Sequence, residues 1–265
     1  FLGIRLQLNR IANSGWSTFA EQWLIAIPSS SSSFNGLELY HRSFKCFSFT
    51  DNMKGHFIVF EGIDGCGKTT QITELTNWLP KSGLMPKGTT LHVTREPGGT
   101  SLGNQLRELL LHPPIENSPH PITELLMYAA DRAQHVSEII KPALDKGDWI
   151  ISDRFSGSTV SYQGYGRGLN FELIHQLELI ATQSIVPDLT FWLDLPIEKS
   201  VSRRENATQD RIEAEGADFL KKVSQGFEEI ANKRNWTRIP ADLEKDLIHQ
   251  KIQETLFTYL SIIKR

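Results

Sequence analysis

The sequence predicts a three-layer α/β fold, in which a five-stranded parallel sheet is flanked by helices. Three observations support this prediction: short continuous apolar runs, apolar residues at helical spacing between those runs, and Gly or Pro at the junctions. Continuous apolar runs are typical of parallel strands that are buried on both faces. Strands that alternate with helices imply right-handed crossovers within one parallel sheet.

The first strand is expected at residues 56–62, where the run HFIVFEG ends in glycine. Ile72, Leu75 and Leu79 then recur at the spacing of a helix, which Pro80 ends. The second strand and a turn are expected at residues 89–99. Leucines between residues 102 and 110 indicate the next helix, and a long helical stretch should run from about 122 to 144.

The third strand is expected at residues 149–152 and ends at Asp153, and the fourth at residues 189–195, between two prolines. A fifth is expected at 235–240, followed by a C-terminal helix with apolar residues every four positions from 248 to 260. Ligands of such sheets bind beyond the carboxyl ends of the strands. The polar motifs of this chain fall at those ends, or on segments that could close over them.

Composition limits the classes of function. The 265 residues, 39% hydrophobic and 22% charged, suit one globular domain with or without a tail. A net charge of −3 gives no basic excess, so neither nucleic acid nor a membrane surface is an expected partner. The two cysteines, Cys46 and Cys66, make no disulfide framework and favour a reduced, cytoplasmic setting.

Residues 1–52 differ from the domain expected at residues 53–265. They are rich in serine at 28–34, poor in acidic residues, and followed by Met53. We interpret them as an extension that is disordered or mis-assigned and adds no core. The alternative is an organelle transit segment, which has this kind of composition.

A glycine-rich loop joins the first strand to the first helix. Its sequence GIDGCGKT matches the phosphate-binding pattern G-x-x-x-x-G-K-[ST], so we expect a nucleoside triphosphate to bind these eight residues: Gly62, Ile63, Asp64, Gly65, Cys66, Gly67, Lys68 and Thr69. Backbone N–H groups and the helix dipole favour phosphate there. Lys68 should reach the β- and γ-phosphates and Thr69 should hold Mg²⁺. Asp64 should contact the metal, its waters or a second substrate, or else only shape the turn.

The end of the third strand indicates which reaction the bound triphosphate undergoes. A GTPase needs an N-K-x-D motif, and NKRN at 232–235 lacks the aspartate. A transport or motor ATPase would show a strand ending in two acids, whereas this strand ends in Asp153 and Arg154. An acid for Mg²⁺ or its water, beside a guanidinium for an anionic acceptor, suits phosphoryl transfer between two nucleotides.

Five stretches in series resemble the thymidylate kinase family, whose members phosphorylate dTMP with ATP. They are FEGIDGCGKTT, TREPGGT, MYAADRAQH, SDRFSGSTVSYQGYGRG and RRENATQDRIE, and the resemblance covers about residues 54–262. It implies a fold of the P-loop NTPase type with a mobile lid, ATP and Mg²⁺ at the loop, and a homodimer.

The resemblance also assigns the acceptor side. Arg95 and Arg154 would hold the dTMP phosphate, unless Arg95 merely pairs with Glu96 or Arg154 with Asp153. Asp64 would link the loop to the acceptor.

Further resemblance concerns the base. Tyr128 and Arg132 lie four residues apart and share a helix face, so one could stack on thymine while the other donates to its O4. The alternative for Tyr128 is a place in the core. Thr159 would read the N3 edge or only cap a helix, Tyr162 would crowd the sugar 2′ position, and Gln163 is a weaker candidate for the base edge.

The lid is expected at residues 203–213. In one arrangement of this family an arginine follows the loop aspartate; here Gly65 does, as in the bacterial type, whose lid supplies the charge. We expect Arg211, or next Arg204, to reach the transferring phosphoryl. Lys68, Asp153, Arg204 and Arg211 are thus the expected catalytic set. Another P-loop nucleotide or deoxynucleoside kinase, or a non-catalytic nucleotide-binding domain, remains the alternative.

Overall fold

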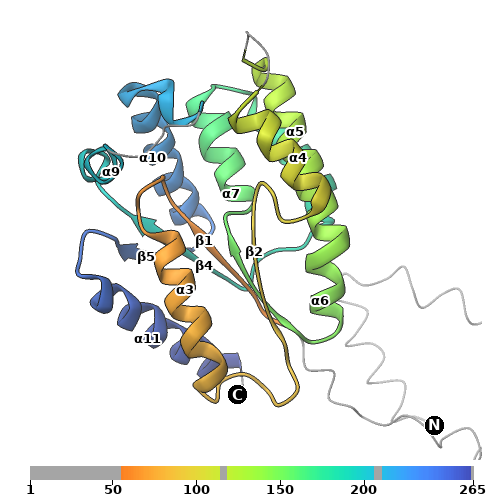
Figure 1. Cartoon of the computed structure of the whole chain (residues 1–265), viewed down its shortest axis with the longest axis vertical. Coiled ribbons are helices and arrows are strands. Elements are labelled where there is room, and N and C mark those ends of the chain that lie inside the picture. Colours follow the sequence, from red (N-terminus) through yellow and green to blue (C-terminus); the bar gives the residue numbers. More distant parts are fainter. Residues whose placement is uncertain (1–54, 114–117, 206–210, 264–265) are drawn as a thin grey trace, which may run out of the picture. The chain divides into compact units, whose positions relative to one another are not determined.

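The five expected strands form one parallel sheet (Figure 1), with the order β2-β3-β1-β4-β5. The strands are β1 (Phe57–Glu61), β2 (Leu91–Arg95), β3 (Trp149–Asp153), β4 (Leu189–Asp194) and β5 (Thr237–Pro240). All four pairings between neighbours are parallel. The computed structural model describes residues 55–113, 118–205 and 211–263. The predicted extension or transit segment at residues 1–52 lies outside these ranges.

Helices connect the strands, as the sequence predicts. In the first half they are α3 (Lys68–Trp78), η2 (Leu79–Lys81), α4 (Ser101–Leu111), α5 (Pro121–His135), the π-helical turn η3 (Val136–Ile140) and α6 (Lys141–Asp145). The last three form the long helical stretch expected at 122–144.

The second half contains further helices. They are α7 (Ser156–Thr159), the π-helical η4 (Val160–Gly166), α8 (Phe171–Thr182), α9 (Ile197–Arg203), η5 (Glu213–Glu215), α10 (Ala217–Lys233) and α11 (Lys245–Ile263). The sequence patterns did not locate α8, and they indicated only the end of α10 as helical. Within the described ranges no helix is both long and apolar enough to cross a membrane.

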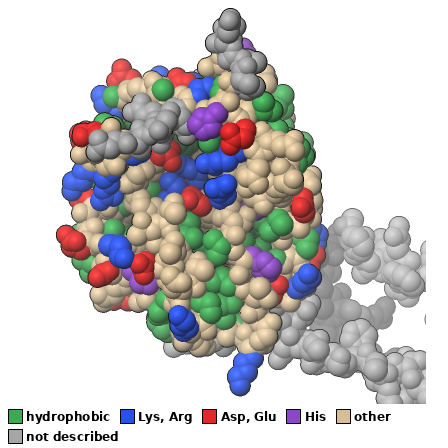
Figure 2. All heavy atoms as spheres, in the orientation of Figure 1, with side chains coloured by type: hydrophobic (Ala, Val, Ile, Leu, Met, Phe, Trp, Pro, Cys, Tyr) green, Lys and Arg blue, Asp and Glu red, His purple; other side chains and the backbone are tan. Residues whose placement is uncertain are grey.

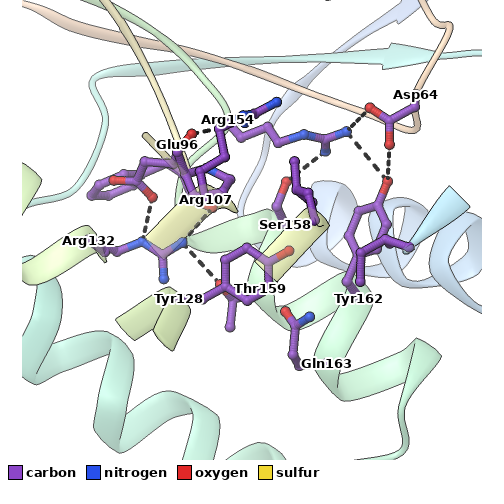
Figure 3. A pocket seen from close by; sticks show the side chains of 14 residues that line it. Asp64, Glu96, Arg107, Tyr128, Arg132, Arg154, Ser158, Thr159, Tyr162 and Gln163 are labelled. Atoms are coloured by element: carbon purple, nitrogen blue, oxygen red, sulfur yellow. Dashed lines mark hydrogen bonds and ion pairs between the residues drawn. The ribbon is translucent and has the colours of Figure 1, made fainter. Parts of the chain in front are cut away.

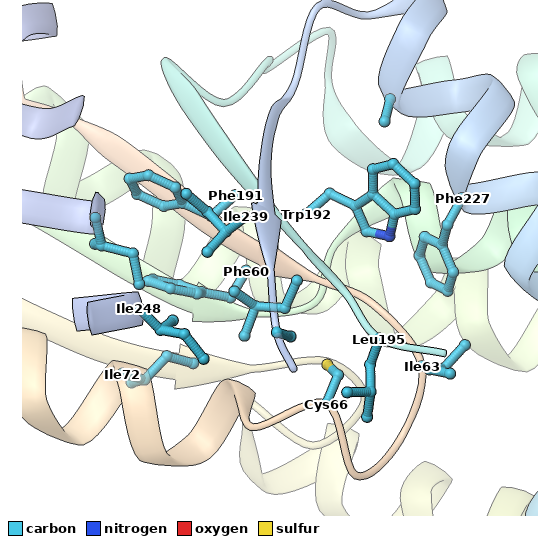
Figure 4. Packing of buried hydrophobic residues seen from close by; sticks show 14 of the residues in the cluster. Phe60, Ile63, Cys66, Ile72, Phe191, Trp192, Leu195, Phe227, Ile239 and Ile248 are labelled. Atoms are coloured by element: carbon cyan, nitrogen blue, oxygen red, sulfur yellow. The ribbon is translucent and has the colours of Figure 1, made fainter. Parts of the chain in front are cut away.

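Alternate residues of the strands supply two cores. On one face Phe60 and Phe191 pack with Ile72 of α3 and with Ile248 of α11 (Figure 4). On the other face Phe57, Val59 and Ile150 pack with Val136 and Ile140 of the long helical stretch, and with Phe155. The sheet is therefore covered on both faces, which explains why its strands are continuous apolar runs.

The carboxyl ends of three adjacent strands bring the sequence motifs together. Arg95 at the end of β2 lies opposite Asp153 in the register, and Asp153 lies opposite Phe60 of β1. The glycine-rich loop leaves β1 directly after Glu61. Residues from three distant parts of the chain thus meet at one edge of the sheet.

Candidate active site

The glycine-rich loop has the geometry of a phosphate-binding loop. Gly62 has a φ of 141°, and a β-carbon there would lie 2.7 Å from the carbonyl oxygen of Leu193. Gly67 has a φ of 97° and stands at the N-terminus of α3. Both positions therefore favour glycine. Lys68 Nζ folds back over the loop and donates to the carbonyl oxygens of Gly62, at 3.1 Å, and Ile63, at 3.2 Å.

Two connected cavities lie beyond the strand ends. The inner pocket is bounded by Tyr128, Arg132, Thr159, Tyr162 and Gln163, which point into one space in Figure 3. The loop hollow is lined by Lys68, Thr69, Arg95, Asp153 and Arg203. Four residues line both: Asp64, Glu96, Arg107 and Arg154. Lys and Arg side chains gather in a depression on the face drawn in Figure 2, a setting that suits phosphate.

A third cavity continues on the far side of the loop. This outer pocket is lined by Thr70 and Gln71 of α3 and by residues 241–245, which run from the end of β5 to the first residue of α11. It shares Gly65, Gly67, Thr70 and Arg203 with the loop hollow. Arg203 donates to the carbonyl oxygens of Gly65, at 3.2 Å, and Ala241, at 3.1 Å, so it stands at the junction of the two cavities.

Arg154 occupies the boundary between the inner pocket and the loop hollow. Its φ of 73° is unusual for a non-glycine residue and re-aims the chain directly after β3. Its guanidinium donates to the Gly62 carbonyl and to Ser158 Oγ, each at 2.9 Å, and to Asp64 Oδ1 at 2.6 Å. Arg154 therefore pairs with Asp64, and the alternative of a bridge to Asp153 is wrong.

Asp64 ties the loop to the inner pocket. Burial pushes the pKa of its carboxyl up, but Arg154 and Lys68 outweigh this and hold the pKa well below its usual range. Tyr162 donates its hydroxyl to Asp64 Oδ2 at 3.1 Å, and burial beside this carboxylate raises the tyrosine pKa well above its usual value. Asp64 is thus an ionised acceptor and Tyr162 a neutral donor.

Arg132 is held in place by a buried network. Its Nε donates to Glu96 Oε2 at 2.8 Å, and its Nη2 donates to Thr159 Oγ1 at 3.0 Å. The other oxygen of Glu96 lies 2.8 Å from His135 Nδ1, and Thr94 Oγ1 lies 2.7 Å from His135 Nε2. The Glu96 carboxylate therefore contacts Arg132 through one oxygen and His135 through the other. The alternative of an ion pair between Glu96 and Arg95 is wrong.

The predicted base-reading residues line the inner pocket together. Tyr128 and Arg132 do share one face of α5, and Tyr128 is only half-buried there, so it is not a core residue. Thr159 lies at the end of α7 rather than at a helix start. Gln163 on η4 lines the same pocket and donates Nε2 to Glu124 Oε1 at 2.8 Å.

Asp153 and Thr69 fit a magnesium site that is completed by phosphate. Asp153 Oδ1 is buried without a hydrogen-bond partner, and both residues line the loop hollow. Among the described residues no three His, Cys, Asp or Glu side chains could hold a metal on their own. Mg²⁺ in kinases commonly takes one or two carboxylates together with substrate phosphates, so the donor set suits this ion.

The lid arginines take three different positions. Arg203 lines the loop hollow and contacts the loop through the Gly65 carbonyl. Arg204 lies with its side chain over Gly65, and its Nε donates to the Ser200 carbonyl at 3.2 Å. Arg211 does not line the hollow: its guanidinium pairs with Glu124 and donates to the Leu110 carbonyl at 2.9 Å. The structure thus brings Arg203 and Arg204, and not Arg211, to the loop.

Two of the four residues that line both cavities were not predicted from the sequence. Arg107 on α4 lines both the inner pocket and the loop hollow and donates to the Pro97 carbonyl at 2.9 Å. For Glu96 the sequence predicts only a possible ion pair with Arg95. The position of Glu96 within the TREPGG motif indicates a place at the site. Arg107 lies among the leucines of a helix, and only its closeness in sequence to that motif points to the site.

Comparisons with known proteins agree on one family. The sequence model of the family described as Thymidylate kinase matches residues 60–252. Thymidylate kinase of Prochlorococcus marinus (strain MIT 9313) is 59% identical over 204 residues, which are 77% of this chain and 94% of that protein. Thymidylate kinase of Synechococcus sp. (strain WH7803) is 61% identical over 213 residues, 80% of this chain and 100% of that protein.

Solved structures give the same result. A crystal structure of thymidylate kinase from Ehrlichia chaffeensis is similar with a TM-score of 0.63 at 33% sequence identity. The similarity covers 77% of this chain and 99% of that one.

Proposed function

The chain belongs to the thymidylate kinase family and phosphorylates dTMP, and we propose that it does so across the inner pocket, the loop hollow and the outer pocket. The observation that carries this proposal is the position of Arg154, which lines both the inner pocket and the loop hollow. A guanidinium at that boundary can hold the acceptor phosphate next to the loop that holds the donor.

On the donor side, we propose that the ATP phosphates occupy the loop hollow and the adenine occupies the outer pocket. The outer pocket is the cavity that adjoins the loop on the side away from the inner pocket. Lys68 would exchange its contacts with the loop carbonyls for phosphate oxygens. Arg203, at the junction of the two cavities, would flank the nucleotide between its phosphates and its base.

On the acceptor side, Arg154, Arg95 and Arg107 would bind the dTMP phosphate, since all three line the loop hollow. Asp64 would hold Arg154 in position through its short ion pair. Ionised carboxylate and guanidinium partners make the stronger hydrogen bonds of proteins, so this pair pre-organises the phosphate site.

The base would occupy the inner pocket. Tyr128 would stack on the thymine ring, while Arg132, held by Glu96, would donate to O4. Thr159 and Gln163 would contact the N3 edge, and Tyr162 would crowd the sugar 2′ position. The half-buried ring of Tyr128 supports stacking, because a face that borders a cavity can accept a base.

Catalysis then consists of positioning and of neutralising charge. The phosphate oxygens of dTMP are already ionised, so no side chain has to act as a general base. Asp153 and Thr69 would hold Mg²⁺, which supplies charge neutralisation at the β- and γ-phosphates. Arg204, at the end of α9, would turn toward the γ-phosphoryl when the lid closes.

We also propose a homodimer that forms through α4, α5 and α8. Large apolar side chains are exposed on these three helices, among them Leu109, Leu126, Phe171 and Ile180, the last 72% exposed. Such a concentration of exposed apolar residues is typical of an interface between subunits. A cytoplasmic location, or an organelle if residues 1–52 are a transit segment, likewise stays a proposal.

The assay that tests this function measures ADP release from ATP with dTMP, dUMP, dCMP, dGMP and thymidine as acceptors. We expect the highest kcat/KM with dTMP and no turnover of thymidine, which lacks the phosphate that the arginines would bind. Lys68→Ala serves as the control for the loop and should abolish turnover. Equal rates with all nucleotides would overturn the assignment of the inner pocket.

A further inference from the structure

One fully buried carboxylate accepts a hydrogen bond from a residue that lines the inner pocket. Glu124 of α5 has no exposed surface, although neither the sequence motifs nor the proposed function use it. Its Oε1 accepts a hydrogen bond from Gln163 Nε2 at 2.8 Å and one from Arg167 Nε at 3.2 Å. Its Oε2 accepts from Arg167 Nη2 at 3.1 Å and pairs with Arg211 Nη2.

Glu124 is ionised in this setting. Burial alone would raise the pKa of its carboxyl, but the hydrogen bonds from Arg167, Gln163 and Arg211 outweigh it and lower the pKa. An ionised carboxylate only accepts hydrogen bonds. The amide group of Gln163 must therefore turn its NH₂ toward Glu124, which settles an orientation that side-chain shape alone leaves open.

The amide oxygen of Gln163 is left to accept a hydrogen bond from a ligand. Gln163 lines the inner pocket, and among the described residues no group donates a hydrogen bond to its Oε1. Gln163 thus presents a hydrogen-bond acceptor to the inner pocket, and Arg132, which lines the same pocket, presents a donor. A thymine or uracil ring presents the matching N3–H donor and O4 acceptor, whereas cytosine has an acceptor at N3 and a donor at N4.

We propose that Glu124 is a positioning residue for base selection: it holds the Gln163 amide with its oxygen toward the base and so favours thymine over cytosine. The proposal rests on the proposed function, because it requires the base to lie in the inner pocket. Glu124 itself does not touch the base. A purely structural role, as a partner of Arg167 and Arg211, would support folding without affecting the choice of base.

The test compares kcat/KM for dTMP and dCMP in the full chain. In Glu124→Gln the neutral partner allows the Gln163 amide to reverse, so the dTMP/dCMP ratio should fall by about tenfold. Arg167→Lys keeps a cation beside Glu124 and leaves Gln163 untouched, and its ratio should equal that of the wild type. A Glu124→Gln enzyme that folds and keeps the wild-type ratio would overturn the proposal.

A second pair of variants tests the proposal if Glu124→Gln alone fails to fold. Glu124→Gln combined with Arg211→Gln neutralises both partners of the Glu124–Arg211 ion pair, while Arg167 keeps its ion pair with Glu215, and Arg211→Gln alone is its control. The double variant should show the lowered ratio and the control should not. If both keep the wild-type ratio, or both lose it equally, Glu124 does not act through Gln163.

Gln163→Met separates this proposal from the proposed function. It removes the amide while keeping the side-chain length, and should lower the dTMP/dCMP ratio as much as Glu124→Gln does. An unchanged ratio in Gln163→Met would mean that Gln163 does not read the base, which contradicts that part of the proposed function. A lowered ratio there with an unchanged ratio in Glu124→Gln would refute only the role of Glu124.

Discussion

The side chain of Arg204 lies directly over Gly65, the residue that follows Asp64 in the phosphate-binding loop. A β-carbon at Gly65 would lie 3.3 Å from Arg204 Cγ and 3.1 Å from the carbonyl oxygen of Ser200. Ser200 Oγ in turn donates to the Asp64 carbonyl at 2.7 Å. The end of α9 therefore contacts the loop at Gly65. With glycine at this position, the loop lacks the positive charge of the family arrangement in which an arginine follows the aspartate.

We expect Arg204 to supply that missing charge during transfer. Arg204→Met should lower kcat by about 100-fold or more while changing both KM values only a few-fold, because the arginine would act mainly on the transition state. Steady-state ADP release measures this. The exposed Arg238, which pairs with Asp194, offers a control variant with unchanged kcat. A larger loss of kcat in Arg211→Met would restore the sequence-based preference for Arg211.

Asp153 should determine the requirement for magnesium. Asp153→Asn replaces the carboxylate whose Oδ1 is buried without a partner, so the Mg²⁺ concentration for half-maximal rate should rise about tenfold or more. Titration of the rate with MgCl₂ measures it, and EDTA should stop turnover of the wild type reversibly. An unchanged Mg²⁺ titration in Asp153→Asn would exclude Asp153 from the metal site.

Asp131 should make stability depend on pH. Burial and the nearby Glu96 carboxylate raise the pKa of Asp131 to about 6 in the folded chain, from its ordinary value of 3.8. Its contribution to stability is full below about pH 4 and is lost as the pH rises through about 6. Relative to Asp131→Asn, the wild type should lose about 1.4 kcal/mol of unfolding free energy between about pH 5 and pH 7.5. Urea titrations measure this, and a constant difference would contradict it.

The proposed dimer can be broken at its apolar surface. Ile180→Glu on α8 places a charge among exposed apolar side chains and should yield monomers by light scattering. Ile262→Glu on α11 is the matched control, since Ile262 is also exposed, at 67%, but lies on a helix of the opposite layer. A wild type that is monomeric at micromolar concentration would refute the proposal.

The sequence was informative where local patterns coincide with the fold. The apolar runs that became β1, β3 and β4 are buried almost throughout, so their pattern located them well. Helix α8 was not located, because it exposes large side chains such as Phe171 and Ile180 and its apolar periodicity is blurred. The proposed subunit interface offers a physical reason for that pattern.

The site was predictable in its motifs but not in its pairings. Strand ends and loop spacing identified Asp64, Asp153 and Arg154, since these stand at fixed places along the chain. The partners of Arg211 and Arg132 could not be read in the same way. Glu124 lies 87 positions from Arg211, and Glu96 lies 36 positions from Arg132, and only the folded chain brings each pair together.

The central claim is that Arg154 holds the acceptor phosphate at the boundary of the inner pocket and the loop hollow. Calorimetric titration of dTMP into wild type and Arg154→Met, each folded as judged by thermal melting, tests it most directly. We expect dTMP affinity to fall by about 100-fold, because a buried charge-assisted contact is lost, while affinity for a non-hydrolysable ATP analogue changes only a few-fold. Equal affinity of both proteins for dTMP would contradict the claim.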